Sequence, residues 1–411
     1  MRLKPGNPLT VSLRWSAAEN LTVGRLAALR GTAILEFAPG FGATGVQIDP
    51  LRYPAGPGLH PARTRHFGGL HGVFADSLPD GWGRLLLHRR LARAGIRIDD
   101  LDPVDLLALV GAAGRGALVY EPAIAPDDGE DGGFDLDQLA AGAAAILEGR
   151  ESDLIEILAR LGGSSGGARP KVHVGFDGTG RIVCGEGDLP GEAEPWIVKF
   201  RAAEDPEDIG PIEMVYAEMA TAAGLEMAEC RLIPAERGPG YFATRRFDRV
   251  AGGGRLHMLS LCAALEAPYG VTAASYDTFL RATLALTRSA ADVAMAFRRM
   301  VFNVLAHNRD DHIRQHSYLM DRHGRWRLAP AYDLTFSRGP GGEHYLDVEG
   351  EARQPTVENM LTLGRRHGLK DRQMASILDE VRGGVARWSG LAGVYGVGRD
   401  MRTEIQRVLS R

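Results

Sequence analysis

The sequence predicts an α+β protein with a β-rich N-terminal subdomain, a mixed β/α lobe and a helical lobe. Its 411 residues exceed what one hydrophobic core usually fills, so we expect more than one domain. Short alternating apolar segments dominate the first part and return in the middle, whereas the last part has the apolar spacing of helices. Between the first two parts lies an acidic, glycine-rich segment, APDDGEDGGFD (residues 125–135), which is typical of a linker.

Residues 1–120 form the predicted N-terminal subdomain. Segments such as TAILEFAPGFGATGVQID favour short strands joined by turns. Two expected helices, GWGRLLLHRRLARAG and PVDLLALVGA, and a strand, RGALVYEP, follow them. Residues 121–150 then comprise the acidic linker and one helix, LDQLAAGAAAILEG.

Residues 151–255 form the predicted mixed lobe, and residues 256–411 form the helical lobe. In the mixed lobe, the segments that favour strands are KVHVGF, RIVCGEG, WIVKF, CRLIPA and YFATRRF, and those that favour helices are SDLIEILARL and IEMVYAEMATAAG. After residue 256 the spacing is almost wholly helical, except around HNRDDHIRQHSYLM (residues 307–320).

The composition excludes several classes of protein. Hydrophobic residues at 45% and charged residues at 24% are ordinary for a soluble chain, and a net charge of -4 gives no broad basic surface for nucleic acid. The three cysteines, Cys184, Cys230 and Cys262, are too far apart for a disulfide framework or a cysteine-rich zinc site. The start lacks an apolar signal segment, and no run approaches the roughly 18 apolar residues of a membrane span. The sequence therefore predicts a cytoplasmic protein.

The segment HNRDDHIRQHSYLM carries the strongest indication of chemistry. Asp310 is followed five residues later by Gln315, which is the spacing of a kinase catalytic loop. In such a loop the carboxylate accepts the proton of the substrate hydroxyl, and the amide oxygen holds a metal ion. Mg²⁺ prefers oxygen ligands of this kind.

The next segment, HSYLMDRHGRWRLAPAYDLT, reads as a strand, a turn at residues 322–325, a second strand and a loop that reaches Asp333. Because a hairpin folds the chain back, we expect Asp333 to lie beside Asp310 and Gln315. It would supply a second oxygen ligand to a phosphate-binding metal site.

Three upstream features have counterparts in the same type of site. Lys199 lies inside the apolar strand WIVKF, where a charge is costly unless it meets an anion. Glu213, at the start of the next helix, is a possible ion-pair partner for it. The segment GGSSGGARPK (residues 162–171) could present backbone N–H groups to phosphates, although it matches neither standard nucleotide motif.

Each feature also has a simpler interpretation. His307, His312 and His316 could be solvated residues or zinc ligands, and Lys199 could reach solvent from an edge strand. Glu213 could favour the helix N-terminus, Asp333 could be a turn or cap residue, and GGSSGGA could be a flexible linker. The order of the five features along the chain favours the kinase site over these separate explanations.

The motifs in this order resemble those of the HipA family, the serine/threonine-kinase toxins of bacterial type II toxin–antitoxin systems. The resemblance covers nearly the whole length. GVFADSLPDGWGRLLL and DLLALVGAAGRGALVYEP are similar to the family's N-terminal subdomain. GGSSGGARPKV, WIVKF, RRFDR, NRDDHIRQH and RLAPAYDL are similar to its kinase core. The resemblance implies a kinase-like two-lobed core, with ATP and Mg²⁺ as cofactors.

The resemblance implies a role for each matching residue. Asp310 matches the catalytic base, and Lys199 matches the lysine at the ATP phosphates. Asp333 and Gln315 match the positions of the metal ligands. The implied ATP-binding residues are Ser164, Ser165, Gly166, Gly167, Ala168, Lys171, Lys199, Phe247, Asp248, His312, Tyr332 and Asp333.

Within that set, Phe247 falls where the family's hinge offers backbone groups to adenine, and Asp248 lies beside the nucleotide. Ser164 matches the serine whose autophosphorylation ejects the Gly-rich loop and switches the kinase off, and Ser165 is a second candidate. A phosphoserine adds roughly −1.5 to −2 charge, which would repel the ATP phosphates.

The resemblance further implies the reaction and its partners. The γ-phosphate of ATP would pass to a serine or threonine hydroxyl on a translation component, such as an aminoacyl-tRNA synthetase. A small helix-turn-helix antitoxin of the HipB type would bind the protein and carry the contact with operator DNA.

One residue departs from the family pattern, because Gln315 stands where the family usually has asparagine. Glutamine keeps the amide oxygen but adds a methylene, and Mg²⁺ tolerates little geometric error. An alternative is therefore a degenerate pseudokinase that binds nucleotide and acts as a corepressor with an antitoxin. A metal-dependent hydrolase built on the histidines is a third hypothesis.

Overall fold

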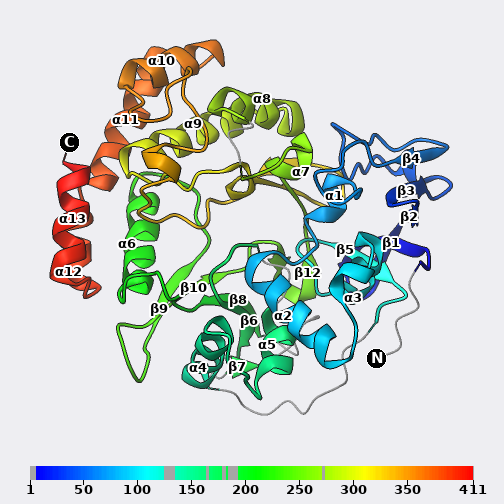
Figure 1. Cartoon of the computed structure of the whole chain (residues 1–411). Helices are drawn as coiled ribbons and strands as arrows, with labels where there is room; N and C mark the ends of the chain where they lie inside the picture. Colours follow the sequence, from blue (N-terminus) through cyan, green and yellow to red (C-terminus); the bar gives the residue numbers. More distant parts are fainter. Residues whose placement is uncertain are drawn as a thin grey trace.

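The computed structural model describes residues 6–124, 135–162, 166–177, 182–183, 193–270 and 274–410 (Figure 1). It is an α+β protein with antiparallel sheets, as the sequence predicts. The N-terminal sheet, blue in Figure 1, lies on one side of the molecule, and the C-terminal helices, orange and red, lie on the other. The predicted linker falls almost entirely outside the described residues.

The N-terminal subdomain is built on a five-stranded sheet in the order β4-β3-β2-β1-β5. Its strands are β1 (Leu9–Ser16), β2 (Glu19–Leu29), β3 (Thr32–Phe37), β4 (Leu59–Pro61) and β5 (Leu118–Glu121). Its helices are α1 (Gly72–Ala75), α2 (Gly81–Arg93) and α3 (Pro103–Val110), with short 3₁₀ turns η1 (Phe41–Thr44) and η2 (Ile98–Asp100). The apolar residues of β1 alternate and are buried at every second position from Leu9 to Trp15, which is the pattern of a strand with one face on a core.

The mixed lobe contains a second five-stranded sheet, in the order β7-β6-β8-β10-β9. Its elements are β6 (Lys171–Phe176), β7 (Ile182–Val183), β8 (Glu194–Lys199), β9 (Cys230–Ile233), β10 (Tyr241–Arg245), α4 (Leu136–Leu147), α5 (Ile155–Gly162) and α6 (Ile209–Ala222). On one face, Trp196 and Val198 pack with α2, α4 and α5. Because side chains alternate along a strand, Lys199 points to the opposite face, toward α6.

The helical lobe follows two short pairing strands, β11 (Arg249–Val250) and β12 (Gly254–Arg255), with the turn η3 (Ala251–Gly253) between them. Its helices are α7 (Leu261–Leu265), α8 (Tyr276–Thr287), α9 (Ala290–Leu305), α10 (Val357–Arg366), α11 (Asp371–Val385), α12 (Trp388–Val394) and α13 (Arg399–Leu409). The irregular segments between α9 and α10 include the turns η4 (Ile313–Gln315) and η5 (Pro340–Gly342).

A three-stranded sheet, β13-β14-β15, is embedded in this lobe. The hairpin of β14 (Ser317–Met320) and β15 (Trp326–Leu328) has its turn where the sequence predicts it. The edge strand β13 (His257–Ser260) was not predicted, because its four residues run directly into the apolar pattern of α7.

The N-terminal subdomain is joined to the helical lobe by buried polar contacts. The carboxylate of Asp76 accepts hydrogen bonds from the Ser260 backbone N–H at 2.6 Å and from its hydroxyl at 2.7 Å. Arg52 donates to the carbonyl oxygens of Ala264 at 3.1 Å and Leu265 at 2.6 Å. Two ends of α7 are thus fixed to the N-terminal subdomain. None of the helices in the described ranges has the length and apolar character that a membrane span needs.

We predict that Asp76→Ala destabilises the protein, because it leaves the buried N–H and hydroxyl of Ser260 without their acceptor. An unsatisfied buried donor typically costs about 1–3 kcal/mol of folding free energy. Urea unfolding of both proteins measures the difference. Asp371→Ala, at an exposed ion pair with Arg365, should leave the midpoint unchanged. Equal midpoints for wild type and Asp76→Ala would contradict the prediction.

Candidate functional site

The predicted catalytic loop begins where α9 ends, and buried side chains fix its course. His307 has a left-handed backbone with φ of 53°, and the Asn308 side chain donates to that of Asn303 at 3.0 Å. Asp311 is fully buried. Its carboxylate accepts from the Tyr276 hydroxyl at 2.6 Å and lies 2.8 Å from His344 Nδ1.

Burial of Asp311 leaves its neighbour Asp310 facing outward, with a side chain that is 47% exposed. Partial removal from water raises the pKa of Asp310, and the nearby charge of Asp333 adds to this, whereas His312 acts against it. The imidazole Nε2 of His312 lies 3.8 Å from the Asp310 carboxylate. Of the two adjacent aspartates, Asp310 is therefore the one that a reactant can reach.

Asp333 lies beside this loop, because the β14–β15 hairpin returns the chain to it. Its backbone is left-handed, with φ of 58°, a conformation that non-glycine residues adopt mainly where the surroundings impose it. The Gln315 side-chain amide donates to Asp333 Oδ2 at 2.9 Å, and Asp333 Oδ1 forms an ion pair with Lys199. The structure therefore brings Asp333, Gln315 and Lys199 together.

Lys199 connects the two lobes electrostatically. Besides Asp333, its amine lies 2.9 Å from the carboxylate of Glu213, which is buried in α6. Burial alone would lower the pKa of Lys199, but Asp333 and Glu213 raise it above its ordinary value. The same lysine, with Lys171, holds the pKa of Asp333 well below its ordinary value despite the opposing effect of burial.

A second lysine lies directly opposite Lys199. Lys171 on β6 is the cross-strand partner of Lys199 on β8, and it is only 4% exposed. Burial lowers the pKa of Lys171 to about 8. Like charges that face one another across a sheet are unfavourable, and the carboxylates of Asp333 and Glu213 offset this repulsion.

An apolar cluster flanks the charged groups. Phe247 and Tyr332 pack against the buried residues Met258, Leu319 and Ala329, and the two rings are 5.6 Å apart. The Tyr332 hydroxyl donates to the Arg314 carbonyl at 2.6 Å. Phe247 follows the last strand of the mixed lobe and Tyr332 directly precedes Asp333. This apolar surface is therefore shared by the two lobes.

Asp248, a predicted nucleotide-binding residue, is held by other protein groups. Its carboxylate accepts from Arg246 at 2.8 Å, from Arg249 at 2.7 Å and from the Gly116 backbone N–H at 2.8 Å. Although burial alone would raise the pKa of Asp248, the two arginines hold it well below its ordinary value. Asp248 thus connects the end of the mixed lobe to the N-terminal subdomain, and its contact with nucleotide stays a prediction.

The remaining predicted residues are those of the Gly-rich segment and His312. Gly166, Gly167 and Ala168 lie against the N-terminus of α2, with the Lys171 amine donating to the Gly166 carbonyl. Ser164 and Ser165 lie outside the described residues. His312 accepts from the Arg314 backbone N–H at 3.3 Å.

The sequence alone did not identify Arg169, which binds Oε1 of Glu213 at 2.8 Å, whereas Lys199 contacts Oε2. Nor did it identify two rings beside His312, those of Tyr269 at 5.6 Å and Tyr345 at 5.4 Å. Arg169 is 44 residues from its partner, and no spacing rule connects such distant positions. Its location two residues before Lys171 is the only local signal.

The histidines that raised the zinc alternative do not converge. His316 is buried with its ring stacked on Phe279 at 4.0 Å, and His307 stacks on Phe336 at 5.4 Å. Within the part of the chain that the structure describes, the one cluster of three groups able to hold a metal is an acidic one far along the chain from these histidines. It comprises Asp135, Asp137 and Glu236.

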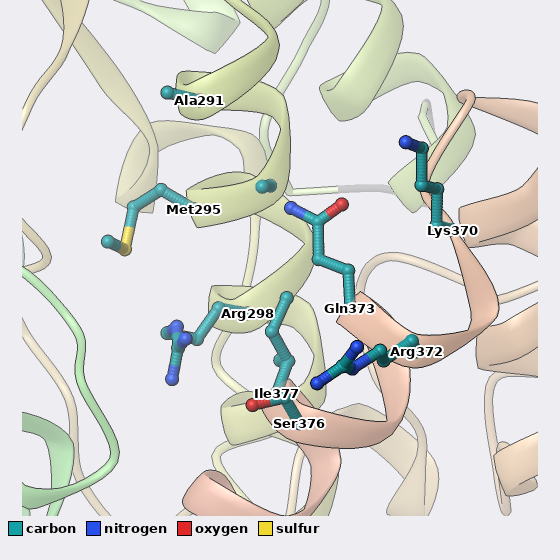
Figure 2. A pocket seen from close by; sticks show the side chains of 9 residues that line it. Ala291, Met295, Arg298, Lys370, Arg372, Gln373, Ser376 and Ile377 are labelled. Atoms are coloured by element: carbon teal, nitrogen blue, oxygen red, sulfur yellow. The ribbon is translucent and has the colours of Figure 1, made fainter.

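A surface pocket of about 550 Å³ lies between α9 and α11. Figure 2 shows Arg298, Lys370 and Arg372 around it. None of the predicted site residues lines it. It is therefore separate from the cluster around Asp333, and its basic residues offer control positions for experiments on that cluster.

We predict that Asp248→Asn destabilises the protein by about 3–5 kcal/mol at neutral pH, because it removes a buried negative charge that contacts the guanidinium groups of both Arg246 and Arg249. An aspartate with a depressed pKa stabilises the fold at pH values above its unfolded pKa, near 3.8. The difference in unfolding free energy should therefore be constant above about pH 5 and shrink as the pH falls below 4.

Urea unfolding at several pH values measures this difference. Asp379→Asn, at an exposed pair with Arg382, serves as the control and should follow the wild type throughout. A small penalty, or one independent of pH down to pH 3, would contradict the structural role of Asp248.

Comparison with known proteins agrees with the geometry. A model of the HipA-like C-terminal domain matches residues 163–388, and a model of the HipA N-terminal domain matches residues 17–121. No curated protein matches the chain.

The solved structures that are similar to this one include the following two. The first is HipA of Shewanella oneidensis MR-1, from a toxin–antitoxin complex of HipA, HipB and operator DNA. It has a TM-score of 0.70 and 15% sequence identity, and the match covers 98% of this chain and 95% of that one. The second, the Helicobacter pylori proinflammatory kinase CtkA, has a TM-score of 0.40 and 11% identity over 60% of this chain and 87% of its own.

The first likeness shows that the fold, with its kinase-like two-lobed core, is that of HipA. The C-terminal family model alone spans more than half of the chain. The chain therefore belongs to the HipA family.

Proposed function

We propose that this protein is a serine/threonine protein kinase that transfers the γ-phosphate of ATP to a protein hydroxyl. The observation that carries the proposal is the meeting of Lys199 with Glu213 and Asp333, next to the loop of Asp310 and Gln315. A strand lysine, a helix glutamate, a metal-binding aspartate and a catalytic-loop aspartate are the parts of a protein-kinase site.

The two facing lysines support the binding of polyphosphate. Lys171 and Lys199 are both largely buried and lie opposite each other on adjacent strands. An anion between them would relieve their mutual repulsion and make strong charge-assisted hydrogen bonds in a site with little water. The apolar faces of Phe247 and Tyr332 would receive the adenine ring, because they lie between the lobes and next to Asp333.

The donor set at Asp333 fits a magnesium ion. A carboxylate and a side-chain amide that are hydrogen-bonded to each other at 2.9 Å can both supply oxygen ligands, which Mg²⁺ prefers. When bound with ATP, the ion would neutralise negative charge on the phosphates. Lys199, Lys171 and Arg169 would balance the rest of that charge.

Asp310 would act on the acceptor. Its exposed carboxylate takes the proton of the incoming hydroxyl while the hydroxyl oxygen forms a bond to the γ-phosphorus. The bond from the γ-phosphorus to the bridging oxygen breaks, and ADP leaves. A raised pKa makes Asp310 a stronger base than an ordinary aspartate, provided that it stays ionised at neutral pH.

The partner and the substrate that we propose are those that the resemblance to the HipA family implies. The Shewanella HipA structure is a complex with HipB and operator DNA, and we extend this to propose a HipB-like helix-turn-helix antitoxin for this chain. Its net charge of -4 is consistent with DNA contact through such a partner. The proposed acceptor is a translation component such as an aminoacyl-tRNA synthetase, with autophosphorylation at Ser164 or Ser165 as the means of inactivation.

One observation favours a second candidate, a nucleotide-binding pseudokinase that acts as a corepressor with the antitoxin. Gln315 presents its amide nitrogen to Asp333, and its side chain is one methylene longer than the asparagine usual in the family. A kinase that uses Gln315 must turn the amide oxygen toward the metal ion. A pseudokinase has no such requirement.

We predict that incubation with Mg-ATP adds phosphate to the wild type and not to Asp310→Asn, because asparagine cannot accept the hydroxyl proton. Loss of a general base typically slows transfer by about 10²–10⁴-fold. Intact-mass spectrometry, with fragment mapping to residues 164–165, measures the phosphate. Both proteins should gain thermal stability from nucleotide.

Lys370→Met, at the pocket between α9 and α11, is the control for a charge change outside the site and should be phosphorylated like the wild type. Nucleotide-induced stabilisation without phosphate on this chain or on an added bacterial lysate would support the pseudokinase. Absence of both stabilisation and phosphate would contradict both functions.

We also predict that affinity for Mg-ADP falls as the pH rises through 8, because Lys171 must be charged to bind phosphate and its pKa is lowered to about 8 by burial. Affinity at pH 9 should be about tenfold below that at pH 7. In Lys171→Arg the guanidinium stays charged, so the affinity should be nearly flat. Calorimetric titration measures both profiles, with Lys370→Arg as the control that keeps the wild-type profile. A flat wild-type profile would refute the role of Lys171.

A further inference from the structure

Asp80 immediately precedes α2 (Gly81–Arg93), but its side chain does not cap that helix. It occupies the N-cap position, where an aspartate normally accepts a hydrogen bond from the first turn of its own helix, and no such bond is present. Instead, Oδ1 accepts from the Gly167 backbone N–H at 2.8 Å, and Oδ2 forms an ion pair with Arg314. The side chain is only 19% exposed. A residue of the N-terminal subdomain thus binds two separate parts of the catalytic core.

The first of these parts, residues 166–168 of the Gly-rich segment, packs against the start of α2. Gly81 has φ of 45°, and a Cβ there would lie 2.5 Å from the Gly167 carbonyl oxygen, so only glycine permits this approach. The Trp82 backbone N–H donates to the same carbonyl at 3.2 Å, and its indole donates to the Lys171 carbonyl at 3.1 Å. The backbone of Gly167 is therefore held at its N–H by Asp80 and at its carbonyl oxygen by Trp82.

The second part is the catalytic loop, because Arg314 lies between Asp310 and Gln315 in the sequence. Its guanidinium carbon lies 4.1 Å from the centre of the Tyr269 ring, and its carbonyl accepts from the Tyr332 hydroxyl at 2.6 Å. These contacts hold the guanidinium group of Arg314 through Tyr269 and its backbone carbonyl through Tyr332. A shift of the loop would therefore move the charge that Asp80 faces.

We propose that Asp80 is a positioning residue that couples the Gly-rich segment to the catalytic loop. The inference rests on the proposed kinase function, in which the Gly-rich segment covers the ATP phosphates. One carboxylate serves as acceptor for Gly167 and as counter-charge for Arg314, so the position of each depends on the other. Loss of the ion pair leaves Asp80 free to turn, and the Gly167 N–H loses a fixed acceptor.

The decisive experiment measures hydrogen exchange of residues 166–171 in the nucleotide-free protein. Arg314 and Gly167 bind different oxygens of Asp80, yet Arg314→Gln should accelerate exchange of the Gly167 amide by about tenfold, as should Asp80→Asn. The double variant should exchange no faster than either single one, because both remove the same coupling. Asp80→Glu, which keeps the charge, should restore part of the protection.

Arg372→Gln, at the pocket between α9 and α11, is the matched control and should exchange like the wild type. Unchanged Gly167 exchange in Arg314→Gln, in a variant with wild-type unfolding midpoint, would overturn the coupling. So would additive effects in the double variant. If a variant unfolds, Arg314→Lys, which keeps the charge and loses the fork geometry, takes its place.

Steady-state kinetics provide the second readout. In Asp80→Asn the KM for ATP should rise about tenfold while kcat falls less, because a displaced phosphate cover weakens nucleotide binding before it affects proton transfer. Equal losses in kcat and kcat/KM, with KM unchanged, would contradict a positioning role. The exchange measurement needs neither nucleotide nor turnover, so failure of the kinase proposal and failure of the coupling are distinguishable.

Discussion

The fold of the catalytic core depends on the placement of one positive charge between two negative ones. Lys199 comes from the sheet of the mixed lobe, Glu213 from the helix beside it, and Asp333 from the loop that leaves the β14–β15 hairpin. A buried lysine keeps its charge at low cost where carboxylates contact it, so the contact constrains where all three elements can lie. The same carboxylates lie close to two further cations, because Lys171 is the cross-strand partner of Lys199 and Arg169 pairs with Glu213.

The sequence predicted this cluster because each member carries a local signal. A lysine inside an apolar strand and an aspartate after a hairpin are unusual in their own segments. The order of these features along the chain then favoured a kinase site. The sequence could not predict the contacts of Asp80 or Arg169, whose partners are 234 and 44 residues away. The strand β13 was missed for a different reason, because a four-residue strand that leads into a helix has no period of its own.

The contacts of Asp248 show what a motif alone does not reveal. The resemblance places the segment RRFDR near the nucleotide, and Phe247 lies on the apolar surface with Tyr332. The carboxylate of Asp248 contacts Arg246, Arg249 and the backbone N–H of Gly116 in the N-terminal subdomain. Residue type and spacing could not predict the contact with Gly116, which is 132 residues away, and the contact of Asp248 with nucleotide stays a prediction.

The adjacent pair Asp310 and Asp311 has a consequence for how substitutions in this loop are interpreted. The two aspartates are adjacent in the sequence, yet the side chain of Asp311 is buried and that of Asp310 is partly exposed to solvent. Substitution of Asp311 would release Tyr276, His344 and the loop together, so its loss of activity would arise from misfolding of the loop. An inactive Asp311 variant is therefore poor evidence of chemistry, whereas an inactive but fully folded Asp310 variant is good evidence of it.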